Sequence, residues 1–222
     1  MRDYFKNALW IGKVGQGKCP ILRRTFVVEG TVEAATLRVN PLGFCDSFIN
    51  GERIGDRVLE PGVSNYAKRS FVLEYDVTAQ LHRGTNCMVL WLGPGWFPVT
   101  DPNERMLFPE LIHDGPLVRA EVVVQTDSRE PLVVGTDESW KTAASHLTPL
   151  GQCSHGNFGG ERFDARTVIN GWADPGFDAA MWENAASITV PQHEVAVYEG
   201  PPNRVIQSWE PKAVTPFEDA DG

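Results

Sequence analysis

Three stretches of the sequence carry side chains that could bind a ligand. They are VLEPGVSNYAKR at residues 58–69, LGPGWFPVTDPNE at 92–104 and GERFDAR at 160–166. The first two combine aromatic rings with oxygen-bearing side chains, and the third holds two carboxylates and an arginine. An apolar surface with a few placed polar groups is the usual form of a small-ligand site. The three stretches therefore favour binding of a hydroxyl-rich molecule such as a sugar, or of a cation that takes oxygen ligands.

The stretch at 92–104 offers the aromatic surface. Trp96 and Phe97 follow a Gly-Pro-Gly segment that can hold a ring at a loop surface, and sugars stack their C–H faces on such rings. We expect Asp101 and Asn103 to supply polar contacts, or oxygen ligands for calcium. The alternative is that Trp96 closes the end of the core, since most tryptophans are largely buried.

The stretch at 58–69 combines a turn with polar side chains. Pro61 and Gly62 force the turn, and Asn65 and Tyr66 follow it. We expect both to contact sugar hydroxyls, with the Asn65 amide oxygen also available to calcium. The alternative is that this loop only packs under the edge of a sheet.

The stretch at 160–166 has two interpretations. Glu161 could be a ligand of a sugar or of calcium. The favoured interpretation is structural, an ion pair of Asp164 with Arg166 or with an arginine of another strand.

No known catalytic motif is present. The sequence contains no nucleophile elbow, P-loop, HExxH or GxGxxG pattern, and its five histidines are scattered. Two carboxylates of a glycosidase must lie about 5–9.5 Å apart, and among 29 acidic residues some pair will do so by chance. We therefore expect no independent catalysis and assign no catalytic residue.

The elements that would position these side chains are short, frequent strands. Such a series without long helices indicates an all-β protein, an antiparallel β-sandwich of two packed sheets or a barrel. Asn50-Gly51 predicts a type I′ hairpin turn. The strands are expected at 21–28, 32–39, 70–77, 85–93, 117–125 and 131–137, with 85–93 apolar enough to be covered on both faces.

Two short helices are also predicted. One begins at Asp76 or Thr78, and the other begins at Asp178 and turns Met181 and Trp182 inward. Trp182, together with Trp140, is expected to anchor the core.

Composition limits the kinds of binding partner and the cellular compartment that we expect. The formal net charge of −9 argues against nucleic acid and against an anionic membrane surface. No apolar run approaches the about 20 residues of a membrane-spanning helix, and no signal peptide is visible, which favours a cytoplasmic protein while leaving secretion open. Cys45 and Cys87 lie in strand-like runs and are expected to be buried free thiols.

The order of several motifs resembles a known family. The segment 49–86 (INGERIGDRVLEPGVSNYAKRSFVLEYDVTAQLHRGTN) followed by LGPGWF resembles the N-terminal β-sandwich domain of bacterial α-L-rhamnosidases. Further pieces fit in the same order, and the resemblance covers nearly the whole chain. They are LWIG (9–12), TDESWK (136–141), GERFDAR (160–166), GWADPGFDAAMW (171–182) and PPNRVIQSWEPKAV (201–214), the last corresponding to the family's exit strand.

This resemblance implies a jelly-roll or galactose-binding-like sandwich that is an accessory to catalysis. In the family the catalytic machinery lies in an (α/α) barrel further along, and some relatives of this domain bind L-rhamnose with a calcium ion. It divides the chain into a lead-in segment (1–20), a sandwich domain (21–210), and a linker or truncated end toward a catalytic domain (211–222).

Three hypotheses follow for function. The first is a non-catalytic accessory domain of an α-L-rhamnosidase-like glycoside hydrolase, with the catalytic domain of the same enzyme and a rhamnose-containing carbohydrate as partners. It would pack on the catalytic barrel and bind a terminal L-rhamnose-type sugar, with calcium as the one cofactor considered. The second is a free-standing lectin-like module, and the third is a small glycosidase in its own right.

Overall fold

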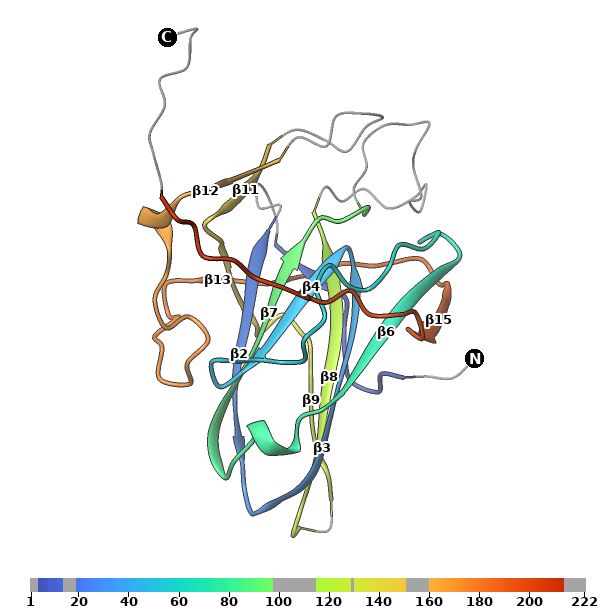
Figure 1. Cartoon of the computed structure of the whole chain (residues 1–222). Helices are drawn as coiled ribbons and strands as arrows, with labels where there is room; N and C mark the ends of the chain where they lie inside the picture. The colour runs from blue at the N-terminus through green and yellow to red at the C-terminus, as the bar shows by residue number, and fades with distance from the viewer. Residues whose placement is uncertain (1–3, 14–18, 98–114, 129, 151–159, 214–222) are drawn as a thin grey trace, which may run out of the picture.

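The chain folds into two large β-sheets packed face to face, with a small two-stranded hairpin beside them (Figure 1). The computed structural model describes residues 4–13, 19–97, 115–128, 130–150 and 160–213. The predicted antiparallel β-sandwich is confirmed, and each of the six predicted strand runs overlaps a strand.

The first sheet has seven strands, in the order β14-β1-β8-β3-β6-β15 with β9 also paired to β8. Only β15 runs parallel to its neighbour, β6; the other pairs are antiparallel. The strand β1 falls within the predicted lead-in segment, so this segment contributes to the sandwich. The strands are β1 (Ile11–Gly12), β3 (Val32–Leu42), β6 (Arg69–Asp76), β8 (Leu117–Thr126), β9 (Leu132–Gly135), β14 (Ala186–Ser187) and β15 (Glu194–Val197).

The second sheet has six antiparallel strands in the order β13-β10-β2-β7-β4-β5, and β11 pairs with β12 in the separate hairpin. The longest pairing of the six-stranded sheet joins β2 and β7, and β4 flanks β7 on its other side. The strands are β2 (Pro20–Val28), β4 (Phe44–Ile49), β5 (Glu52–Arg53), β7 (Gly84–Gly93), β10 (Lys141–Ala144), β11 (Leu147–Pro149), β12 (Glu161–Phe163) and β13 (Glu183–Asn184).

The main core lies between the two large sheets. Alternate residues of each central strand point into it, including Leu37 of β3, Leu90 of β7 and Val122 of β8, all 0% exposed. Trp140 is also fully buried and donates its indole N–H to the Gly135 carbonyl at 3.0 Å, which confirms it as a core anchor.

The predicted thiols are buried and free. Cys45 and Cys87 are both free cysteines with buried side chains. Burial raises the pKa of the Cys87 thiol to about 11 and raises that of Cys45 further, because removal from water disfavours the thiolate.

The six-stranded sheet is apolar on its outer face as well. The odd residues of β7, including Val89 and Trp91, point away from the main core. Trp172 and Trp182 from the segment after β12 pack against them. This second apolar layer confirms the prediction that the strand at 85–93 is covered on both faces.

The hairpin between β4 and β5 has the predicted turn. Asn50 and Gly51 both have positive φ, 52° and 87°, as a type I′ turn requires. Ile49 pairs with Glu52 across it. The Asn50 side chain also accepts a hydrogen bond from the Cys87 N–H at 2.8 Å, so this residue is structural.

One predicted helix is present and the other is wrong. The 3-10 helix η1 (Thr78–Gln80) lies where the first was expected, and the Asp76 carboxylate accepts hydrogen bonds from the Thr78 N–H and hydroxyl. These bonds lower the pKa of Asp76.

The described residues contain no helix with the length and apolar character that a membrane span requires.

The second predicted helix is replaced by a turn. Asp178 does accept a hydrogen bond from the Ala180 N–H, but the chain then turns directly into β13, where Asn184 pairs with Lys141. Met181 is 96% exposed rather than inward, while Trp182 packs half-buried on the outer apolar layer. Pairing with β10 overrides the local helix signal because strand continuation needs an extended backbone here.

Candidate functional site

A cleft of about 640 Å³ opens at one end of the six-stranded sheet, beside the β11–β12 hairpin. This volume lies within the about 300–1,000 Å³ range of small-ligand sites. All three stretches that were predicted to bind a ligand meet at it. They contribute Leu59 and Glu60, then Gly93 to Gly95, and then Gly160 and Glu161.

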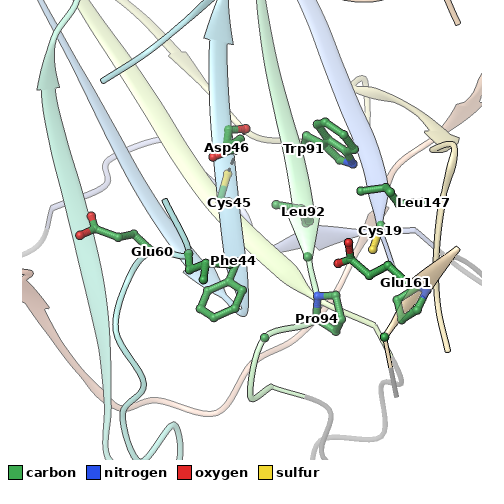
Figure 2. Close-up of a pocket in the computed structure, with 15 residues that line it drawn as sticks. Cys19, Phe44, Cys45, Asp46, Glu60, Trp91, Leu92, Pro94, Leu147 and Glu161 are labelled. Atoms are coloured by element: carbon green, nitrogen blue, oxygen red, sulfur yellow. Dashed lines mark hydrogen bonds between the residues drawn. The ribbon is translucent and has the colours of Figure 1, made fainter. Parts of the chain in front are cut away.

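The wall of the cleft is mainly apolar. Trp91, Leu92 and Phe44 come from the adjacent strands β7 and β4, and Leu147 comes from β11 (Figure 2). Strand alternation turns Trp91 outward, where its ring lies 5.1 Å from the His146 ring, centroid to centroid. The position of this ring is therefore fixed from the side by neighbouring rings.

Glu161 is the carboxylate best placed to meet a ligand. It lies on β12, opposite Pro149 of β11, and is exposed. Figure 2 shows its carboxylate turned toward Pro94 and Leu92 in the middle of the cleft. Among the described residues it makes no ion pair, so its oxygens are available to accept hydrogen bonds from sugar hydroxyls.

The other two carboxylates of the cleft are already paired with arginines. Arg53 Nη2 lies 2.6 Å from Asp46 Oδ1, and Arg57 Nη1 lies 3.1 Å from Glu60 Oε2. Glu60 is buried, and its second oxygen has no hydrogen-bond partner among the residues that the structure describes. In Figure 2 the Glu60 carboxylate lies on the side opposite Glu161 and is turned away from it.

Two of the predicted sugar contacts are wrong because their rings are buried. Phe97 is 0% exposed and Tyr66 is 3% exposed, and the two rings pack edge to face with centroids 5.4 Å apart. The Tyr66 hydroxyl is hydrogen-bonded to the backbone of Gly43, and burial raises its pKa to about 12. Both residues belong to a second core cluster with Trp10, Leu42 and Leu117, so neither can offer a face to a ligand.

Trp96 remains available. Its side chain is 39% exposed, and the preceding residue, Gly95, lines the cleft. Trp96 therefore does not close the end of the core. Its neighbour Phe97 is the buried residue.

The predicted calcium ligands are only partly described. Asn65 is exposed, and its backbone carbonyl accepts hydrogen bonds from the N–H groups of Lys68 and Arg69. Asp101 and Asn103 lie outside the described residues. In the described part of the chain, no three His, Cys, Asp or Glu side chains come together as a metal site would require. Calcium binding by Asn65, Asp101 and Asn103 therefore stays a prediction.

The favoured interpretation of GERFDAR is confirmed for two of its residues. Arg166 Nη2 lies 2.7 Å from Asp164 Oδ2, and Asp164 also caps the short helix η2 (Ala165–Thr167) by accepting from the Arg166 N–H. These hydrogen bonds lower the pKa of Asp164. Of the two carboxylates in this stretch, Glu161 is the one that forms no ion pair among the described residues.

Sequence reasoning missed most of the apolar wall. Phe44, Trp91 and Leu147 belong to no motif, and none was singled out. A usable signal existed for Trp91, because an uninterrupted apolar strand must place large side chains on both of its faces. Its position shortly before the Gly-Pro-Gly turn puts it at the strand's end, where a covering layer is least complete.

Comparison with known proteins decides the family. A family model described as the α-L-rhamnosidase N-terminal domain matches residues 30–207. The chain belongs to this family. An α-L-rhamnosidase of Formosa agariphila is 28% identical over 193 residues, which are 86% of this chain and 20% of that protein.

Solved structures agree with this assignment. The α-L-rhamnosidase of Dictyoglomus thermophilum superposes with a TM-score of 0.78 at 29% identity, covering 90% of this chain and 23% of that one. The α-L-rhamnosidase of Streptomyces avermitilis, solved in complex with L-rhamnose, gives 0.74 at 26% identity, covering 86% and 18%. The α-L-rhamnosidase N-terminal domain seen here thus spans about a fifth of the length of the curated relatives that it matches.

Proposed function

We propose that this chain is a non-catalytic accessory domain of an α-L-rhamnosidase-like glycoside hydrolase and that its cleft binds a terminal L-rhamnose-type sugar. The accessory role is supported by how little of its relatives the chain covers. The chain matches an N-terminal domain model over most of its length, yet corresponds to only 16–20% of its curated relatives. The reaction would therefore belong to the remaining part of such an enzyme.

The shape and chemistry of the cleft support the second half. A 6-deoxy sugar such as L-rhamnose has an apolar methyl group and an apolar C–H face next to its hydroxyls. Trp91, Phe44 and Leu147 offer an apolar wall, and the Glu161 carboxylate, which forms no ion pair with the described residues, offers an acceptor close to it. The exposed Trp96 ring could cover a second face of the sugar.

The carboxylates of the cleft favour binding over catalysis. A retaining or inverting glycosidase needs two carboxylates across the scissile bond, one of them protonated. Asp46 forms an ion pair with Arg53 and Glu60 forms one with Arg57, so one oxygen of each carboxylate is already engaged within the protein. Hydrolysis of an aryl L-rhamnoside by the purified chain would support the alternative of a small glycosidase, and we expect none.

The lectin-like alternative shares the cleft but needs no further domain. A mass measurement of the intact gene product distinguishes the two. A product several times larger than this chain supports the accessory domain, and a product of 222 residues supports the free-standing module.

Sugar binding is tested by titration of L-rhamnose with and without calcium, followed by tryptophan fluorescence. We expect saturation at millimolar sugar and a response that Glu161→Gln weakens roughly 10–100-fold. That range corresponds to the about 1.5–3 kcal/mol of a hydrogen bond to a charged group. Trp96→Ala should reduce both affinity and signal.

The matched control is Glu33→Gln. Glu33 is also an exposed strand carboxylate, but it lies on β3 and is not part of the cleft. Its substitution should leave the titration unchanged. Absence of any response at millimolar sugar, in either calcium condition, would remove the proposal; an equal effect of the two glutamate variants would remove the role of Glu161.

A further inference from the structure

The last described part of the chain is an extended segment that exposes large apolar side chains. Residues 201–213, called here the exit segment, contain no strand, and every residue from Asn203 onward is exposed. Val205 is 67% exposed, Ile206 is 97% exposed and Trp209 is 78% exposed. In Figure 1 this segment is the red trace that leads away from β15 toward the β11–β12 end of the molecule.

The start of the exit segment is fixed to the sandwich. The Val58 N–H donates to the Asn203 carbonyl at 3.0 Å, and Arg57 and Arg204 form an isolated antiparallel β-bridge. Arg204 Nε also lies 2.5 Å from Asp56 Oδ2. The direction of the segment is therefore set by specific contacts up to Arg204.

Beyond Arg204 these contacts end. Within the described part of the chain, residues 205–213 make no hydrogen bond and no ion pair. Every one of these nine residues is exposed, including the apolar ones. A single exposed apolar residue is ordinary, but a group of three on an extended, anchored strip is the kind of surface that marks an interaction site.

Burial of these side chains would be strongly favourable. Transfer of a large apolar side chain from water to an apolar surface is favourable roughly in proportion to the area buried, and Trp buries more area than Val or Ile. An extended backbone with free N–H and C=O groups can also add to the edge of another sheet. The strip thus fits a partner with an apolar surface that follows its extended course.

We propose that the exit segment is a docking strip, and that its partner is the part of the enzyme that follows this domain. This rests on the proposed accessory role. The family model ends at residue 207, within the strip, and the matched relatives are about five times longer than the matched region. The strip therefore lies where the domain passes into the rest of such a protein, and a covalently attached partner is present at high effective concentration.

Hydrogen exchange by mass spectrometry tests this on two proteins, the present chain and the intact gene product. In the present chain the amides of residues 205–213 should exchange at the rate of an unstructured peptide. In the intact protein we expect at least tenfold slower exchange. The double variant Ile206→Ser/Trp209→Ala should restore fast exchange there and lower the melting temperature of the intact protein.

The matched control is Met181→Ser, because Met181 is 96% exposed but lies outside the strip. It should change neither exchange nor melting in either protein. In the present chain the double variant should leave the melting temperature unchanged, as surface substitutions usually do. This neutrality shows that any effect in the intact protein comes from docking and not from damage to the sandwich.

Two outcomes would overturn the docking strip. One is fast exchange of residues 205–213 in an intact protein that does carry further domains. The other is a dimer of the present chain in which these amides are protected and the double variant dissociates it, since the partner would then be a second copy. An intact product no longer than this chain would instead overturn the accessory role, and failure of rhamnose binding alone would leave the strip unaffected.

Discussion

The two faces of the six-stranded sheet are both apolar, but they are covered in different ways. On the inner face, Leu22 and Leu90 are 0% exposed and pack against the seven-stranded sheet. On the outer face, Trp91 is only half-buried under irregular chain that includes Trp172. The regular sheet covers the inner face completely, whereas the irregular segment covers only part of the outer face and leaves the cleft open at the end near Trp91.

This difference separates stability from recognition. Complete burial on the inner face gives each side chain its full transfer free energy, so this face holds the fold together. The partly covered outer face contributes less to stability but presents fixed rings and a carboxylate to solvent. A sandwich can therefore bind a ligand without opening its core.

The largest expected effect is on the inner face. Leu90→Ala should lower the free energy of unfolding by about 3–4 kcal/mol, because it removes transfer free energy and leaves a cavity between two rigid sheets. Urea denaturation followed by tryptophan fluorescence measures this. A loss below about 1 kcal/mol would show that the inner face is not better covered than the outer one.

A smaller loss of stability is expected on the outer face when Arg23 is replaced. Arg23 holds the irregular segment that covers this face. Arg23 is 4% exposed, and its guanidinium donates to the carbonyls of Trp172 and Asp174 at 3.2 and 2.6 Å. Arg23→Ala should cost about 2 kcal/mol, since hydrogen bonds to charged groups are worth about 1.5–3 kcal/mol. Exchange of amides in 171–182 should accelerate more than exchange in β7.

Arg23→Lys sharpens this prediction. Lysine keeps the charge but lacks the planar fork that reaches two carbonyls at once, so it should restore only part of the lost stability. Full restoration by lysine would mean that charge, and not hydrogen-bond geometry, holds the outer layer in place.

The smallest effect is a pH dependence on the outer face of the other sheet. His193 Nδ1 lies 2.8 Å from the Pro191 carbonyl, so Nδ1 must donate, and Nε2 lies 2.8 Å from the Ser70 hydroxyl. The neutral imidazole fits both contacts, with Nε2 accepting from Ser70. Burial first, and then the nearby Arg119, lowers the pKa of His193 below its usual 6.5, although the hydrogen bond to Pro191 opposes this.

The sign of the effect follows from this lowered pKa. Below pH 6.5 the unfolded chain binds a proton at His193 that the folded chain excludes, so stability is full above pH 6.5 and falls as pH drops toward the folded pKa. Unfolding free energies between pH 7.5 and 5 should therefore decline less steeply in His193→Gln than in the wild type. Equal slopes would show that His193 titrates alike in both states.

Much of the fold could be predicted from local patterns. The strands followed from alternation and apolar runs, and Asn50-Gly51 specified its turn because both residues must take positive φ. The prediction of a helix beginning at Asp178 was wrong because a capping signal is local. It does not show that Glu183 and Asn184 pair with the distant strand β10.

The candidate site was predicted only as a set of segments. Each of the three stretches does reach the cleft, but the residues chosen within them were often the wrong ones. Phe97 was chosen with Trp96, and the structure buries Phe97 against Tyr66 while leaving Trp96 exposed. Adjacent side chains in a loop point in different directions. The sequence alone does not show which of them points into the core and which into solvent.

The sequence by itself determined the periodicity of the strands, the hairpin turn and membership of the family, because these depend on residues close together in the chain or on their order. Tertiary structure alone decided which aromatic rings are buried, and it brought Glu161 beside strands β4 and β7. It also decided that two carboxylates of the cleft are paired with arginines, while Glu161 has no ion pair within the described part of the chain. Burial and pairing are relations between segments far apart in sequence, and they are fixed only when the sheets pack.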